Sequence, residues 1–261
     1  MLVPQAREEP ASAPENGAPE FVVSAVVRVL KQDALGRIEL VRCGEALAVR
    51  RLALGGKLPF SRRVARMLLA REERALRALA GLAGVARVLA RASDGGALVR
   101  SFLPGTPLCL ATELPRDFFE RLEELVRALH ERGVCHNDLH KEANVLVGTD
   151  GYPGLVDFQL ASRHARRGRT FRVRAREDLR HVWKHRSHYL RALGEADPLR
   201  AAPPARSALA EGWRRFGKPL YRRVTSAAAL REELGGAEPR RGKDGPWPCW
   251  SAPVGPRVRS R

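Results

Sequence analysis

Apolar and polar residues alternate between residues 21 and 54, which is the period of β-strands. Turns near residues 33–36 and at Gly44 divide this stretch, so the pattern predicts three consecutive strands. Two further short strands are predicted at residues 86–89 and 97–100, on either side of a Ser-Asp-Gly-Gly turn. We therefore expect a small antiparallel sheet of five strands in the first part of the chain.

Between these two groups of strands the apolar residues recur at intervals of three and four, which predicts a helix from Ser61, as N-cap, to Gly81. Glu72 lies in register with the apolar stripe of this helix. A buried carboxylate needs a cationic partner, and the preceding strand offers Arg50 and Arg51. A partly exposed Glu72 at the edge of the stripe is the alternative. The apolar stripe consists of Val64, Leu68, Leu76 and Leu79.

After a connector rich in Pro and Gly the pattern is mainly helical. The first predicted helix has Pro115 in its first turn and ends before Gly133. The second predicted helix ends at Gly194. Less regular patterns predict helices at residues 207–216 and 220–234. The chain is therefore expected to be α+β, with two lobes. The predicted parts are a disordered leader at 1–20, an N-lobe at 21–103, a reduced, mainly helical C-lobe at 104–235 and a flexible basic tail at 236–261.

Composition narrows the class of protein. The 261 residues are 44% hydrophobic, which is too apolar for a disordered chain. No apolar run reaches the length of a membrane span, and the N-terminus lacks the order of a secretory signal, so we expect a cytoplasmic protein. The formal net charge is +18, and only six of the 47 basic residues are Lys, a bias that a GC-rich coding sequence also produces. The charge therefore permits a nucleic acid or an anionic inner-membrane surface as partner without specifying either.

The residues that carry chemistry precede and follow a predicted hairpin. Val145–Val147 and Leu155–Val156 are short apolar strands joined by a turn containing Asp-Gly. Asn144 leads into the first strand and Asp157 ends the second, so the hairpin brings an amide oxygen and a carboxylate together. Oxygen ligands of this kind suit Mg²⁺ with phosphates as its remaining ligands. Asp138 lies six positions before Asn144, close enough to reach a hydroxyl beside the metal.

The pattern His136-x-Asp138, Asn144 and then Asp157-Phe158 resembles the catalytic loop and metal-binding triplet of the protein-kinase-like superfamily. The separation of 13 positions from Asn144 to Asp157 is the one found in that superfamily. The order of a five-stranded lobe with one helix, a connector and a helical lobe also agrees. The resemblance covers about residues 21–195. Within the superfamily the chain is most similar to minimal bacterial and RIO-type kinases, lipopolysaccharide core-sugar kinases and aminoglycoside phosphotransferases.

The resemblance implies an ATP- and Mg²⁺-dependent kinase. In this reading Asp138 orients the acceptor hydroxyl and accepts its proton, while Asn144 and Asp157 hold Mg²⁺ on the ATP phosphates. Glu72 matches the glutamate of the N-lobe helix, and Ser101–Gly105 is the hinge beside the adenine. Asp178 either ties its helix to the catalytic loop or is an acidic residue favoured at a helix N-terminus.

Several positions depart from the family pattern. Arg50 stands where the nucleotide-contacting Lys is usual, and Lys31 could contact the phosphates instead. The first turn contains only Gly36 and lacks the usual glycine-rich motif. The loop from Asp138 to Asn144 is one residue longer than usual, and Asn137 replaces the Arg that reads activation-loop phosphorylation. We therefore expect no regulation by phosphorylation of an activation loop.

Other polar clusters have simpler interpretations. The four cysteines are isolated, so a disulfide framework or a cysteine zinc site is not expected. His181, His185 and His188 are interpreted as part of a solvated basic face in preference to a metal cluster. The arginines from Arg163 to Arg169 form either a solvated loop or a site for phosphates of the acceptor.

Three hypotheses follow for the function. The first is a kinase acting on an alcohol hydroxyl, either Ser/Thr of a protein or a sugar such as a lipopolysaccharide core residue, with a protein, sugar or lipid acceptor as partner. The basic surface would suit an anionic acceptor or an anionic inner leaflet, and the second would place the enzyme peripherally at the inner membrane surface. The second is a pseudokinase that acts as a nucleotide-responsive binding module. The third is an Arg-rich nucleic-acid binder on a kinase-like scaffold.

Overall fold

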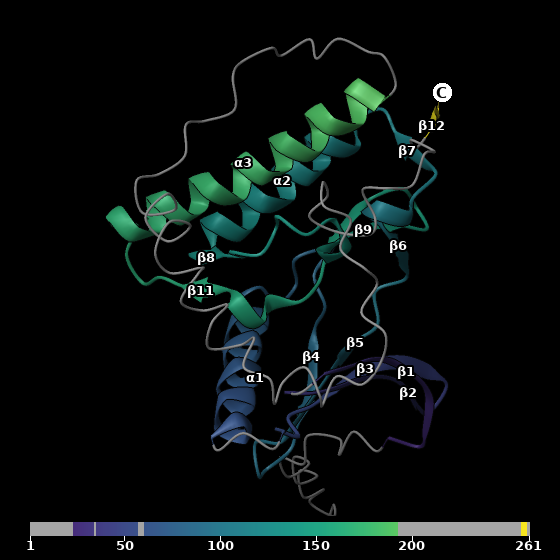
Figure 1. Ribbon diagram of the computed structural model, residues 1–261, viewed down its shortest axis with the longest axis vertical. Coiled ribbons are helices and arrows are strands. Elements are labelled where there is room, and N and C mark those ends of the chain that lie inside the picture. The colour runs from purple at the N-terminus through teal and green to yellow at the C-terminus, as the bar shows by residue number, and fades with distance from the viewer. Residues whose placement is uncertain (1–22, 34, 57–59, 193–256, 260–261) are drawn as a thin grey trace, which may run out of the picture.

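The computed structural model describes residues 23–33, 35–56, 60–192 and 257–259. Its N-terminal part is a five-stranded antiparallel sheet with the order β1-β2-β3-β5-β4, shown in the lower half of Figure 1. This confirms the predicted sheet. The strands are β1 (Ala25–Asp33), β2 (Gly36–Cys43), β3 (Ala46–Leu52), β4 (Val88–Arg91) and β5 (Ala97–Ser101).

Helix α1 (Ser61–Ala78) packs beside this sheet, as predicted, but its buried face differs from the predicted stripe. Val64 is 40% exposed, whereas Ala65 and Leu69 are buried. The buried face is therefore turned by one residue from the predicted stripe in the first turns of the helix. Glu72 lies on this face and is fully buried. Ser61 does not cap the helix with its side chain, because its hydroxyl bonds to Gly56.

The second part of the chain starts with a strand that joins the predicted hairpin. Residues 105–107 pair with one hairpin strand, which makes a three-stranded sheet that the sequence pattern did not predict. A two-residue pairing, β8 with β11, lies beside the catalytic loop. The elements are β6 (Gly105–Pro107), η1 (Leu108–Leu110), β7 (Glu113–Pro115), β8 (Val134–Cys135), η2 (Glu142–Asn144), β9 (Val145–Gly148), β10 (Pro153–Leu155), η3 (Phe158–Leu160) and β11 (Ser162–Arg163).

Two long helices, α2 (Phe118–Glu131) and α3 (Arg169–Ala192), lie side by side over this part (Figure 1). Pro115 ends strand β7 and lies outside α2, in contrast to the prediction. The apolar stripe of α2 is buried as predicted. The buried face of α3 includes His185 and Tyr189. The prediction that the histidines of this helix lie on a solvated face is therefore wrong for His185, which is 1% exposed. The two lobes and the α+β class agree with the kinase-like fold predicted above.

Some predicted parts lie outside the described residues: the leader, the helices at 207–216 and 220–234, and the predicted tail apart from β12 (Arg257–Arg259). Strand β12 pairs in parallel with β7. Among the described residues, the helices are too short or too polar to span a membrane. The boundaries drawn at 103/104 and 235/236 stay predictions.

Candidate active site

Asp178 on α3 holds the start of the catalytic loop. Its two carboxylate oxygens accept hydrogen bonds from the backbone N–H groups of His136 and Asn137, both at 2.8 Å. Asn137 has a φ of 65°, a left-handed conformation that needs support from its surroundings. The carboxylate and the amide of Asn137, which donates to the Leu160 carbonyl and the Ser162 hydroxyl, provide that support. Of the two roles considered for Asp178, the structure shows the tie to the catalytic loop.

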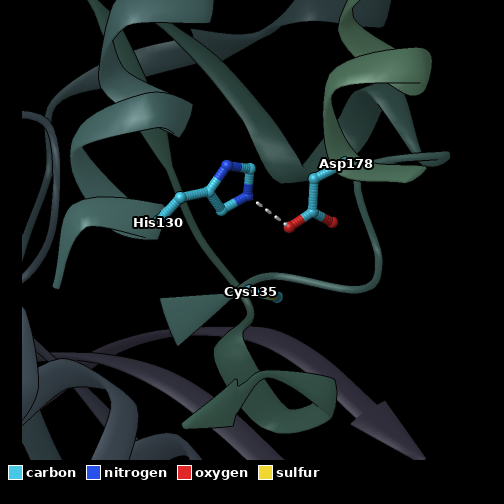
Figure 2. Close-up of side chains that lie close together, drawn as sticks. All are labelled: His130, Cys135 and Asp178. Carbon is cyan, nitrogen blue, oxygen red and sulfur yellow. Dashed lines mark hydrogen bonds and ion pairs between the residues drawn. The ribbon is translucent and has the colours of Figure 1, made fainter. Parts of the chain in front are cut away.

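His130, Cys135 and Asp178 bring a ring nitrogen, a sulfur and a carboxylate within 4.8 Å of one another, as Figure 2 shows. The chemistry of this cluster does not suit a cation. Burial raises the pKa of the Cys135 thiol to about 12, so the sulfur of this buried cluster is a neutral thiol at pH 7. The Asp178 carboxylate is engaged by two backbone donors and by His130 Nε2 at 3.1 Å. The cluster therefore joins α2, β8 and α3 as a structural core.

Asp138 is 1% exposed and is surrounded by cationic and amide groups. Its Oδ2 accepts hydrogen bonds from Lys141 Nζ at 2.6 Å and from Asn144 Nδ2 at 3.0 Å, and His140 Nδ1 lies 3.0 Å from Oδ1. Burial acts to raise the pKa of Asp138, but the hydrogen bonds and charges of His140 and Lys141 outweigh it and lower the pKa. The carboxylate is thus ionised at neutral pH and can accept a hydrogen bond from a hydroxyl group.

The hairpin joins the ends of its two strands, as predicted. Strands β9 and β10 are antiparallel, and the Val156 N–H donates to the Asn144 carbonyl at 3.0 Å. Asp157 follows directly with a φ of 65°. His136 supports this turn, because its Nε2–H reaches the Val156 carbonyl at 3.0 Å and its ring packs on Phe158. Asn144 is thus hydrogen-bonded to Asp138, and Asp157 directly follows the residue whose N–H donates to the Asn144 carbonyl.

Glu72, the buried carboxylate of α1, is paired with Arg51 and not with Arg50. Arg51 Nη1 lies 3.0 Å from Glu72 Oε2 and 3.2 Å from Asp157 Oδ1, and its Nη2 bonds to Gln159. Arg100 Nε lies 3.3 Å from the other Glu72 oxygen. A single guanidinium thus connects the N-lobe strand and helix to the end of the hairpin.

Arg50, which was predicted to replace the phosphate-contacting Lys, points to the opposite face of the sheet. Side chains alternate along a strand, so consecutive residues cannot both face α1. Arg50 is directly opposite Glu39 on β2 and pairs with it at 2.7 Å. The sequence interpretation was therefore one residue out of register, and Arg51 takes the place next to Glu72. Lys31, the other candidate, is exposed and pairs with Asp33 at 3.4 Å, away from Glu72 and Asp157.

Lys141, His140 and the Glu142–His185 pair were missed by the sequence analysis as parts of the site. Glu142 is buried, and its Oε1 lies 3.4 Å from His185 Nδ1, while His185 Nε2 reaches the Leu139 carbonyl at 2.7 Å. These contacts hold the lengthened loop against α3. The available signal was the extra residue between Asp138 and Asn144, which needs its own anchor because it interrupts the usual loop geometry.

A cavity of about 1060 Å³ lies away from these residues. It is bordered by β6, β7, the start of α2 and the turn after β9, and its lining includes Thr106, Glu113, Asp117 and Asp150. Asp138, Asn144 and Asp157 are not part of it. The catalytic loop and the hairpin, with their convergent polar groups, are therefore the candidate site.

Residues 73–167 match the phosphotransferase enzyme family known as APH. The match begins one residue after Glu72 and includes the catalytic loop, the hairpin and Asp157. It supports a kinase-like phosphotransferase. The match supports the predicted resemblance to aminoglycoside phosphotransferases within the wider protein-kinase-like superfamily. It does not support the predicted resemblance to RIO-type kinases or to lipopolysaccharide core-sugar kinases. No curated protein compared with the chain matches it significantly.

Acid is expected to destabilise this phosphotransferase fold through His181. Burial, together with the charge of Arg180, lowers the pKa of His181 from 6.5 to about 3. The unfolded chain therefore binds a proton below pH 6.5 that the folded chain does not bind, so the free energy of unfolding falls as the pH falls. We expect His181 to account for a loss of about 2 kcal/mol between pH 7 and pH 5.

Urea unfolding at these two pH values measures this loss, and a His181→Gln variant serves as the comparison. The variant should lose less stability on acidification than the wild type. The remaining loss in the variant is assigned to groups such as His136, whose pKa burial also lowers. An identical pH dependence in the two proteins would contradict the role given to His181.

Proposed function

We propose that this chain transfers the γ-phosphoryl group of ATP to an alcohol hydroxyl in a Mg²⁺-dependent reaction. The observation that supports this most is the junction of Asp138, Asn144 and Asp157. The buried, ionised carboxylate of Asp138 is hydrogen-bonded to the amide of Asn144. The carboxylate of Asp157 comes directly after the residue whose N–H donates to the Asn144 carbonyl. Phosphoryl transfer needs a group that orients the hydroxyl and oxygen ligands for a cation on the phosphates.

The donor set fits Mg²⁺. Asn144 uses its Nδ2 on the Asp138 carbonyl and carboxylate, which leaves Oδ1 as its ligand atom, and Asp157 supplies a carboxylate. Both are hard oxygen donors, the type that Mg²⁺ prefers together with phosphate oxygens. When bound, the cation would neutralise charge on the phosphates. Asn144 and Asp157 are thus the residues proposed to hold it.

Asp138 is proposed to position the acceptor hydroxyl. In the reaction the acceptor O–H bond breaks and a new O–P bond forms, while the bond between the γ-phosphorus and ADP breaks. The proton passes to Asp138. Because the Asp138 pKa is lowered, the carboxylate is a weak base whose main task is to orient the hydroxyl, which suits a loose phosphoryl-transfer transition state. Arg51 is proposed to contact the ATP phosphates in place of the usual Lys.

The acceptor is proposed to be Ser/Thr of a protein or a sugar, including a lipopolysaccharide core residue. One observation favours a second candidate, a pseudokinase. Arg51 already contacts Glu72, Asp157 and Gln159, so its guanidinium is occupied without a nucleotide. In a pseudokinase these contacts would persist with nucleotide bound, and no phosphate would be transferred.

Transfer of label from [γ-³²P]ATP tests the proposal. Protein and lipopolysaccharide fractions of a cell lysate are offered separately to the full chain, with and without Mg²⁺. Label should enter one fraction, require Mg²⁺ and disappear with Asp157→Ala. A variant at an exposed carboxylate distant from the loop, Asp94→Ala, should retain the transfer. Labelling that is unchanged in Asp157→Ala would overturn the proposed function, and nucleotide binding without any transfer would favour the pseudokinase.

A further inference from the structure

Seven of the fourteen residues from Arg163 to Arg176 are arginines, and no acidic residue interrupts them. All seven side chains are exposed, at positions 163, 166, 167, 169, 172, 174 and 176. We call these residues the arginine strip. It runs from β11 through the loop into the first turns of α3, along one side of the C-lobe (Figure 1).

The arginine strip differs from other arginines of the same helices in its pairing. On α2, Arg121 and Arg127 each bridge a carboxylate at the spacing of one helical turn, and on α3 Arg180 does the same with Glu177. Arg186 on α3 pairs with Glu120 of α2. In the described part of the chain, Arg163, Arg166, Arg167, Arg169, Arg172 and Arg174 form no ion pair with a carboxylate. Arg167 donates to the Glu131 carbonyl, which is a neutral acceptor.

This concentration of like charge is unfavourable for the protein alone. The N-terminus of α3 adds to the positive potential, because its first turn contains arginines and no acidic residue. Repulsion within the strip is relieved when an anion binds between the guanidinium groups. Each guanidinium can hold phosphate oxygens in a bidentate manner, which a compact ammonium group cannot do.

The strip is attached directly to the catalytic loop. Strand β11, which carries its first arginine, pairs with β8, and β8 leads into His136. Asn137 bonds to the Ser162 hydroxyl immediately before the strip. The first arginine of the strip therefore belongs to a strand that is paired with the segment leading into the loop of Asp138. An acceptor held by the strip would be bound to an element attached to that loop.

The side chains of the strip also distinguish between classes of anionic partner. The aromatic rings between Arg163 and Arg176 are those of Phe171, which is buried, and His164, which packs against Phe171 by an edge contact. A surface that binds single-stranded nucleic acid typically adds exposed aromatic rings on which bases stack. Here the exposed groups are almost entirely guanidinium, which recognises phosphate without stacking. A phosphorylated acceptor is thus favoured over a nucleic acid.

We infer that the arginine strip is a binding site for phosphate groups carried by the acceptor, so that the substrate of this enzyme is already an anionic phosphate ester. The inference rests on the proposed function and specifies its acceptor. A soluble phosphorylated molecule and a phospholipid headgroup both present this chemistry. The arms of the experiment separate these two sources.

The test compares three forms of the full chain: wild type, Arg166→Gln with Arg169→Gln, and the charge-matched control Arg63→Gln with Arg74→Gln. The control arginines are exposed on α1, so both variants lose two positive charges from the surface. Inositol hexakisphosphate is the soluble probe, titrated by calorimetry. Vesicles of phosphatidylcholine with and without phosphatidylglycerol form the lipid arm, and a short RNA is added as a third arm. Thermal unfolding checks that both variants are folded.

The strip variant should bind inositol hexakisphosphate or the anionic vesicles about tenfold more weakly than wild type, since two charge-assisted hydrogen-bonding groups are removed. The control should stay within about twofold, the scale of a general charge effect. Equal losses in both variants, or no binding to either probe, would overturn the inference. So would RNA binding that is lost in the strip variant while the other probes do not bind.

Failure of this inference is distinguishable from failure of the proposed function. Phosphate binding is measured without ATP, and it should persist in Asp157→Ala, which abolishes the transfer. A protein that transfers label but shows no strip-dependent binding keeps the proposed function and loses the phosphorylated acceptor. A protein that binds phosphate through the strip but transfers no label has the opposite result.

Discussion

Replacement of Asp138 by Asn is expected to lower kcat for phosphoryl transfer about a thousandfold, the usual scale for losing a positioned acid–base group. The change keeps the size of the side chain but replaces the negatively charged carboxylate, whose oxygen accepts the hydrogen bond of the hydroxyl, with a neutral amide. Asn144 and Lys141 both donate to the same Asp138 oxygen, so the new amide must present its oxygen to them and turn its nitrogen toward the position of Oδ1. Nucleotide affinity should change little, because Asn144 and Asp157 are retained.

Single-turnover kinetics with a labelled acceptor measure this effect separately from binding. Asp117→Asn is the matched control: it makes the same chemical change at an exposed carboxylate that pairs with Arg121 across one turn at the start of α2. The control should retain the wild-type rate within about twofold. An Asp138→Asn variant with more than a tenth of the wild-type rate would contradict the role of Asp138, and the catalytic assignment would then need another group.

Replacement of Arg51 by Met is expected to reduce both activity and stability. It removes the guanidinium that faces Glu72 and Asp157. Among the described residues, Arg100 is then the remaining cationic partner of Glu72, which is fully buried. Leaving a buried charge with incomplete pairing costs about 3 kcal/mol in the free energy of unfolding. The value of kcat/KM should fall about a hundredfold, as expected when two charge-assisted contacts are lost.

Arg50→Met provides the comparison, because it removes the same side chain one position earlier. Glu39 would still pair with Arg37 at 2.8 Å, so the loss of stability should be smaller. Its kcat/KM should stay near that of the wild type. Urea unfolding and steady-state kinetics on both variants decide between the two arginines. Greater loss of activity in Arg50→Met than in Arg51→Met would restore the assignment made from the sequence.

The difference between Arg50 and Arg51 shows what the sequence could and could not predict. Local patterns were sufficient to predict the sheet, helix α2 and the hairpin. In this hairpin Asn144 precedes the first strand and Asp157 follows the second. Burial of Glu72 also followed from its place in the helical stripe. Which of two adjacent arginines faces Glu72 depends on the parity of β3 in the sheet. That parity is fixed by pairing with β2 and β5, which involve residues distant in the sequence.

Helix α3 illustrates a second limit of the same kind. Its buried face contains Asp178, His185 and Tyr189, which are polar or amphipathic, beside the apolar Val182. Hydrophobic periodicity alone predicts a face of Leu179, Val182, Trp183, Arg186, Leu190 and Leu193, which shares only Val182 with the buried residues of the described helix. The catalytic loop supplies partners for two of these buried side chains: Asp178 receives two backbone N–H groups, and His185 reaches the Leu139 carbonyl. The Tyr189 hydroxyl donates to the Leu108 carbonyl of η1. Such partners become visible only when the loop and the helix are placed together in three dimensions.

The Arg51–Asp157 contact has a mechanical consequence. Arg51 belongs to β3 in the sheet lobe and Asp157 follows β10 in the helical lobe, so their ion pair ties the two lobes together. Any rotation that separates the lobes must first break this tie. Under the proposed function, the phosphate oxygens of a nucleotide would compete with Asp157 for the same guanidinium. Binding of the nucleotide and release of the tie would then be a single exchange of partners at Arg51.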